Sequence, residues 1–145
     1  MGKVRFTTRS QVLPAVFLSS LIFSLVSSGM THENRRIMNG AWGGEHIRLE
    51  VTGHSATIEY DCANGTIDGP LVVDRKGNFN LSGTYVREHG GPIRRGESGD
   101  AHRARYSGWT DGKKLTLTVV ISDTKETVGT FTLTRGQDGR VWKCK

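Results

Sequence analysis

The chain has 145 residues, with 20 lysines and arginines against 14 aspartates and glutamates, for a formal net charge of +6. Its first 28 residues hold three of these cations and no acid, so the 117 residues that follow carry only +3. A surplus this small over that length is not the strong basic excess typical of nucleic-acid-binding proteins and argues against a nucleic-acid partner. The same length suits one domain with a real core.

Residues 1–28 are predicted to be a signal peptide. The segment opens with three cations, Lys3, Arg5 and Arg9. An apolar run over residues 12–26 follows, and then the small residues Ser27 and Ser28. A membrane-spanning helix needs about 20 apolar residues, whereas this run is shorter and is interrupted by Pro14. The order basic, apolar, small predicts a cleaved signal, a secreted or periplasmic protein, and no stable membrane insertion after cleavage.

Residues 29–44 show no hydrophobic period and are predicted to form a flexible N-terminal segment. The segment contains Gly40-Ala41-Trp42, which resembles the Gly-X-Trp near the start of lipocalin-like and avidin-like proteins. In those proteins the tryptophan closes one end of a small barrel. The resemblance implies a core plug for Trp42, and the alternative is a ring that stacks on a ligand.

Residues 45–145 are predicted to form a single β-barrel domain, because apolar and polar residues alternate from Glu45 onward. About eight strands are expected, over residues 47–51, 58–62, 66–74, 79–85, 102–109, 115–121, 129–134 and 141–144. Turn-forming residues separate them, at Gly53-His54, Asn64-Gly65, Lys76-Gly77-Asn78, Asp111-Gly112 and Asp138-Gly139. An all-β, antiparallel, up-and-down barrel removes exposed strand edges, and a two-sheet β-sandwich is the alternative.

The chain has two cysteines, Cys62 and Cys144, and both follow the signal segment. In an oxidising compartment such a pair predicts one disulfide. Two thiols this far apart, without a neighbouring histidine pair, lack the spacing of zinc ligands. We therefore expect neither a metal nor another cofactor.

Four aromatic residues of the predicted strands are expected to reach a barrel mouth or a cavity, in addition to Trp42: Tyr60, Tyr85, Tyr106 and Trp109. An eight-stranded barrel is either filled by side chains or holds one small ligand. The leading hypothesis is therefore a secreted or periplasmic binding module for an unidentified ligand, either a small apolar or amphipathic molecule or an anion.

Residues 87–105 are predicted to form a long loop between the fourth and fifth strands. The candidate residues for binding an anion or a protein partner are Arg87, His89, Arg94, Arg95, His102, Arg103 and Arg105. Guanidinium groups beside glycine-rich backbone suit a carboxylate or phosphate, although mixed charge with glycine is also typical of a solvated hairpin loop. The alternative function is a protein-interaction module, such as an inhibitor or an envelope-assembly factor, that acts through this loop.

No catalytic constellation stands out, so the chain is not predicted to be an enzyme. Glu59 and Asp61 share one face of a strand, but that face is opposite the apolar one and reads as solvent-exposed. Ser98, Asp100 and His102 have the residue types of a Ser-His-Asp catalytic triad, yet the sequence around the serine lacks the nucleophile-elbow motif.

Three short motifs, Trp42-Gly43-Gly44, Asp61-Cys62-Ala63 and Gly90-Gly91-Pro92, occur together in this chain. With the terminal Lys-Cys-Lys, the sequence resembles a group of short exported bacterial proteins without an assigned activity. The resemblance covers most of residues 29–145. It implies a shared fold and paired cysteines, and it supplies no catalytic residue.

Overall fold

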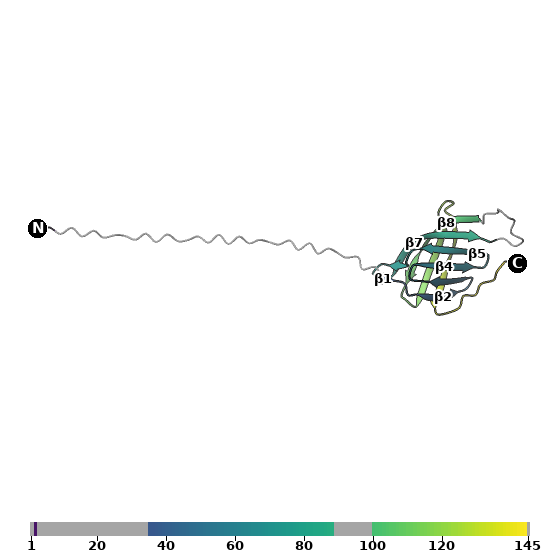
Figure 1. The fold of residues 1–145 in the computed structure, drawn as a ribbon, viewed down its shortest axis with the longest axis horizontal. Helices are drawn as coiled ribbons and strands as arrows, with labels where there is room; N and C mark the ends of the chain where they lie inside the picture. The colour runs from purple at the N-terminus through teal and green to yellow at the C-terminus, as the bar shows by residue number, and fades with distance from the viewer. Residues whose placement is uncertain (1, 3–34, 89–99, 145) are drawn as a thin grey trace. The chain divides into compact units, whose positions relative to one another are not determined.

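The computed structural model describes residue 2 and residues 35–88 and 100–144, and this part of the chain is all β (Figure 1). The strands are β1 (Arg35–Arg36), β2 (Gly40–Gly44), β3 (Ile47–Val51), β4 (Ser55–Tyr60), β5 (Ala63–Asp68), β6 (Val72–Val73), β7 (Asn78–Arg87), β8 (Asp100–Thr110), β9 (Lys114–Ile121) and β10 (Thr127–Arg135). The described residues contain no helix, and so none long and apolar enough to cross a membrane.

Eight of these strands close into an antiparallel barrel, in the order β10-β2-β3-β4-β5-β7-β8-β9. Each strand pairs with its neighbour along the chain, and β10 returns to β2 through Thr134 opposite Gly43 and Arg135 opposite Trp42. Between β5 and β7, β6 leaves the barrel and pairs with β1 in a small second sheet. The predicted all-β, up-and-down barrel of eight strands is confirmed, and the two-sheet sandwich is not what forms.

Side chains fill the interior of the barrel. Period-two alternation turns one face of each strand inward, as Ile47, Leu49 and Val51 of β3 illustrate. The largest fully buried side chains are Trp42, Tyr106, Ile47, Leu49, Ile58, Ile67, Leu115, Leu117, Ile121, Leu133 and Val119. These side chains occupy the centre of the barrel, and the hollows found among the described residues lie at its two ends.

One glycine shows how tightly the strands approach each other. Gly108 of β8 stands opposite Leu117 of β9, and a Cβ atom on Gly108 would collide with the carbonyl oxygen of Thr116. The same Cβ would also lie 2.9 Å from the ring of Phe79. Glycine inside this strand therefore leaves space for a neighbouring backbone and a core ring.

The barrel begins earlier than predicted, because β2 lies inside the segment 29–44 that was expected to be flexible. Gly-Ala-Trp-Gly-Gly has no alternation to signal a strand, but it pairs residue by residue with β3, Trp42 facing Leu49. Burial of the Trp42 ring in the core compensates for the weak strand propensity of the glycines.

The predicted turn at Asn64-Gly65 is wrong, since both residues lie within β5 and the chain reverses at Asp61 and Cys62. Asn-Gly is typical of tight hairpins, but here the glycine leaves space for a side chain inside the barrel. A Cβ atom on Gly65 would collide with the hydroxyl of Tyr106. The predicted strand 66–74 also divides, into the end of β5 and the separate β6.

The predicted last strand, 141–144, does not form. A single parallel bridge joins Glu45 to Arg140, and the chain then continues without strand structure. Its end is held by the Cys62–Cys144 disulfide, with a Cα–Cα distance of 5.2 Å, so the predicted pairing is confirmed. Asp61 assists, because its carboxylate accepts the Trp142 backbone N–H at 2.9 Å.

The predicted loop 87–105 is largely strand at its two ends. Arg87 ends β7, and β8 begins at Asp100, so that His102, Arg103 and Arg105 belong to a strand paired with β7 and β9. Ladder hydrogen bonds on both sides stabilise this extended segment in spite of its charges. His89, Arg94 and Arg95 lie outside the described residues.

Candidate functional site

One end of the barrel gathers most of the polar candidates. We call it the disulfide end, formed by the turns at residues 45–46, 61–62 and 122–126 and by the chain end at Cys144. The opposite end, formed by β1, β6 and the turn at residues 111–113, is the β1 end. In Figure 1 the label C marks the disulfide end, and β1 is labelled at the other.

The disulfide end contains a cavity of about 290 Å³. Its lining consists of His46, Tyr60, Asp61, Cys62, Ala63, Tyr85, Arg87, Val128 and Phe131. The rings of Tyr85 and Phe131 lie 5.6 and 5.5 Å from the ring of Tyr60, so three aromatic side chains form one wall. An aromatic wall with a few polar groups is the usual composition of a small-molecule site.

Two buried phenol groups lie behind the aromatic wall. The Tyr60 hydroxyl is shielded from the cavity, interacts with the Tyr106 hydroxyl, and makes no hydrogen bond of regular geometry in the described part of the chain. The Tyr106 hydroxyl beneath it donates to the carbonyl oxygen of Thr84 at 2.5 Å. Burial raises the pKa of Tyr60, and it raises the pKa of Tyr106 to about 12. Both phenols therefore keep their protons at neutral pH, and it is the ring of Tyr60, not its shielded hydroxyl, that lines the cavity.

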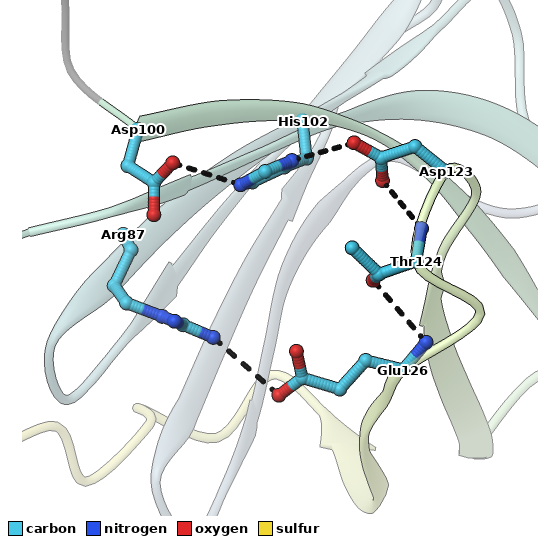
Figure 2. A network of polar contacts seen from close by, with 6 residues as sticks. All are labelled: Arg87, Asp100, His102, Asp123, Thr124 and Glu126. Carbon is cyan, nitrogen blue, oxygen red and sulfur yellow. Dashed lines mark hydrogen bonds and ion pairs between the residues drawn. The ribbon is translucent and has the colours of Figure 1, made fainter.

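Arg87 connects the cavity to a polar network on the rim (Figure 2). Its guanidinium donates to the Glu126 carboxylate at 3.4 Å, from β7 across to the turn before β10. Both side chains are about half exposed, so the pair is worth only about 0–1 kcal/mol. A ligand carboxylate or phosphate would compete with Glu126 for this arginine at small cost.

His102 lies beside this pair, between two carboxylates, as Figure 2 shows. Its Nε2 is 2.9 Å from Asp100, and its Nδ1 is 2.9 Å from Asp123. A neutral imidazole has one donor and one acceptor, whereas ionised carboxylates only accept. The arrangement is therefore satisfied only by the imidazolium, and the hydrogen bonds to Asp123 and then Asp100 raise the His102 pKa above 6.5.

This network predicts a pH dependence of stability. A raised His102 pKa contributes stability below about pH 6.5 that is lost as the pH rises through the folded-state value. The hydrogen bond from His102 also lowers the Asp123 pKa below 3.8. The stability that Asp123 contributes is therefore lost only as the pH falls through this lowered value. We expect the difference in urea midpoint between the wild type and His102→Gln to shrink from about pH 6 to about pH 8. A constant difference would contradict the imidazolium assignment.

A second cluster at the disulfide end links the cavity wall to the chain end. His46 has a positive φ of 65°, a conformation that few residues other than glycine adopt. Its Nδ1 lies 2.6 Å from the Asp61 carboxylate, and its ring packs 5.0 Å from Trp142. The Trp142 backbone N–H, and then His46, lower the Asp61 pKa. The cluster holds one side of the cavity wall in place.

The structure brings together only some of the predicted site residues. Tyr60, Tyr85 and Arg87 line one cavity, and His102 stands beside Arg87 on its rim. Tyr106 lies fully buried beneath the cavity, and Trp42 is fully buried in the core, where no ligand reaches it. Trp109 lies at the β1 end, and Arg103 and Arg105 are exposed positions of β8 that do not line the cavity.

Sequence reasoning did not assign five residues to this site: His46, Asp123, Glu126, Val128 and Phe131. Asp61 was considered only as a solvent-facing acidic pair with Glu59, whereas its carboxylate bonds to His46 in the structure. These contacts join turns that are far apart along the chain, and neither spacing nor periodicity signals them. In the described part of the chain, no group of three or more His, Cys, Asp or Glu side chains is placed to hold a metal ion.

Comparisons of the chain with protein-family models, with curated proteins and with solved structures give no match. The resemblance to short exported bacterial proteins therefore stays a prediction, and the function has to be argued from the side chains described above.

Proposed function

We propose that the protein is a β-barrel binding module that holds a small amphipathic molecule in the disulfide-end cavity. The observation that carries the proposal is the composition of the lining: the rings of Tyr60, Tyr85 and Phe131 form an aromatic wall, and the Arg87 guanidinium beside it has, among the described residues, only an exposed ion pair. Such a wall offers apolar contact area to a ring, and a weakly paired arginine offers a charge-assisted hydrogen bond to an acidic group.

The lining restricts the class of ligand. The volume of about 290 Å³ lies at the lower limit of known ligand sites, which begin at about 300 Å³. Below the cavity the barrel is packed with side chains, so a long acyl chain has no room. Arg87 at the rim favours a carboxylate or phosphate, and the Tyr60, Tyr85 and Phe131 rings favour a flat apolar body. A small ring compound with one acidic group meets these requirements.

The location of the protein is part of the same proposal. The disulfide supports a compartment outside the reducing cytoplasm, and the predicted signal peptide over residues 1–28 agrees with it. We therefore propose a secreted or periplasmic binder. The alternative, a protein-interaction module, depended on a loop whose central residues, 89–99, lie outside the described part of the chain, and no described contact favours it.

The experiment uses two probes of equal shape and opposite charge. Benzoate offers a ring to the aromatic wall and a carboxylate to Arg87, whereas benzamidine places a cation there. Calorimetry and NMR are expected to show binding of benzoate with shifts of the Tyr60, Tyr85 and Phe131 ring signals, and no binding of benzamidine. Arg87→Gln is expected to remove the preference between the two. Equal binding of both, or ring signals that never shift, would contradict the proposal.

Tyr60→Leu tests the aromatic wall, because it removes the ring and keeps an apolar side chain. We expect benzoate affinity to fall about tenfold, together with a loss of about 1–3 kcal/mol in the free energy of unfolding. Tyr106→Phe is the matched control. Its hydroxyl is satisfied by Thr84, so we expect a loss of about 1 kcal/mol of stability and unchanged benzoate affinity. The reverse pattern would show that Tyr60 is only a core residue.

A further inference from the structure

The β1 end carries two neighbouring hollows of about 500 and 580 Å³, on either side of the turn between β8 and β9. Gly112 of this turn lines both, and we call the pair the basic groove. The first hollow is lined by β1, Ile37, Met38, the turn before β7 and Trp109, and the second by the entry to β2 and the end of β10. Neither belongs to the disulfide-end cavity.

Positive charge dominates the lining. Six cationic side chains contribute to it: Arg35, Arg36, Arg75, Lys76, Lys113 and Arg135. Asp111 is the one acidic residue in the lining, and its carboxylate accepts the backbone N–H groups of Lys113 and Lys114 at 2.8 and 2.7 Å. Arg35, Lys113 and Arg135 make no ion pair with any carboxylate in the described ranges. The groove therefore has cations available for an anionic partner.

A fixed tryptophan forms one wall of this groove. Trp109 is 43% exposed, although it is a large apolar side chain. Its indole N–H donates to the Lys76 carbonyl oxygen at 2.7 Å, and the neighbouring Thr110 N–H donates to the Gly77 carbonyl oxygen at 2.9 Å. The ring is thus tied to the turn before β7 and is presented to the groove in one orientation, which lowers the entropy lost when a ligand stacks on it.

Arg135 is held in a similar way. Its guanidinium donates to the Met38 sulfur at 3.2 Å, from the end of β10 to the segment between β1 and β2. Met38 lines the first hollow and Arg135 the second, so this contact connects the two hollows. The two hollows therefore adjoin, and the cations are distributed along both.

We infer that the basic groove binds an acidic polysaccharide chain. Carboxylate or sulfate groups along the chain would pair with the arginines and lysines, and one sugar ring would stack on Trp109 through its C–H face. Two hollows that share Gly112 suit a chain of linked sugar units better than one small molecule. The groove does not overlap the disulfide-end cavity, so this inference stands independently of the proposed function.

Two other anionic partners fit less well. An acidic peptide commonly adds a strand to a sheet edge, but the barrel is closed, and the exposed sheet in the described chain, β1 with β6, has only two residues a strand. An anionic membrane surface requires more apolar insertion than Met38 and Trp109 provide, since they are the two exposed large apolar side chains among the described residues of this end.

The test uses the full folded protein and four probes: polygalacturonate, neutral dextran, poly-glutamate, and vesicles that contain phosphatidylglycerol. We expect calorimetric binding of polygalacturonate that weakens with salt, no binding of dextran, and at least about tenfold weaker binding of poly-glutamate and of the vesicles. Equal or tighter binding of poly-glutamate or of the vesicles would overturn the inference in favour of a peptide or a membrane partner.

Matched variants locate the site. Trp109→Ala and the charge reversal Lys113→Glu are each expected to weaken polygalacturonate binding about tenfold. Trp142→Ala, at the other exposed tryptophan, and Arg103→Glu, at an exposed position of β8 outside the groove, are expected to change it less than about twofold. Arg36→Glu replaces any groove variant whose circular dichroism shows loss of fold. If groove and control variants lost the same polygalacturonate affinity, the binding would be nonspecific electrostatic attraction, and the assignment of the site to the basic groove would be overturned.

Discussion

Trp42→Ala is expected to lower the free energy of unfolding by about 3–5 kcal/mol, the range for deletion of a large buried aromatic side chain. Trp42 is fully buried and stands on β2, opposite Leu49 of β3 on one side and Arg135 of β10 on the other. β10 and β2 share only two residue pairs, so this seam closes the barrel with few ladder hydrogen bonds. The ring supplies packing where the backbone pairing is short. Urea denaturation followed by tryptophan fluorescence and circular dichroism measures the loss.

Trp142→Ala serves as the control for this result. Trp142 is 54% exposed, and its ring contacts His46 at the surface. The loss of the Trp142 ring is expected to lower the free energy of unfolding by less than about 1 kcal/mol, because much of its apolar area is already exposed to water in the folded protein. If the two variants lost the same stability, Trp42 would not be the core plug that its burial indicates.

The strands with clear alternation could be predicted from the sequence, and the glycine-rich parts could not. Residues 47–51 and 115–121 alternate cleanly, and both form strands of the barrel. Gly40–Gly44 does not alternate, because three of its five residues lack a side chain, yet it pairs with two strands. Asn64-Gly65 has the chemistry of a turn, but the space that Gly65 leaves is occupied by the Tyr106 hydroxyl. Tertiary packing overrides the local signal at both places.

The candidate site could likewise be predicted in its strand residues but not in its turn residues. Tyr60 and Tyr85 were predicted to reach a cavity from their places on the apolar faces of strands, and both line one. The partners that give the site its polarity come from turns. His46 meets Asp61, and His102 meets Asp123, over separations of 15 and 21 residues. Such contacts depend on which strands are neighbours in the closed barrel, and a single sequence carries no local pattern for them.

Removal of the disulfide is the second large effect that we expect. Cys62 and Cys144 are 82 residues apart, and the chain-entropy model assigns roughly 4–5 kcal/mol to a loop of this length. Measured losses are often smaller, so the double variant Cys62→Ala/Cys144→Ala is expected to lose about 2–5 kcal/mol in urea denaturation. Reduced wild-type protein should show the same loss, because it lacks the same constraint.

The disulfide also supports the cavity. Its effect on benzoate binding can therefore be measured separately from its effect on the entropy of the unfolded chain. Cys62 lines the cavity beside Asp61, and the tail that ends at Cys144 places the Trp142 N–H on the Asp61 carboxylate. Release of the tail is therefore expected to weaken benzoate binding as well as stability. Lys143→Ala, which removes only the exposed ion pair with Glu88, is the control and should change neither by a measurable amount. If the double variant lost stability but kept full benzoate affinity, the disulfide would act on the unfolded chain alone, and the tail would have no part in shaping the site.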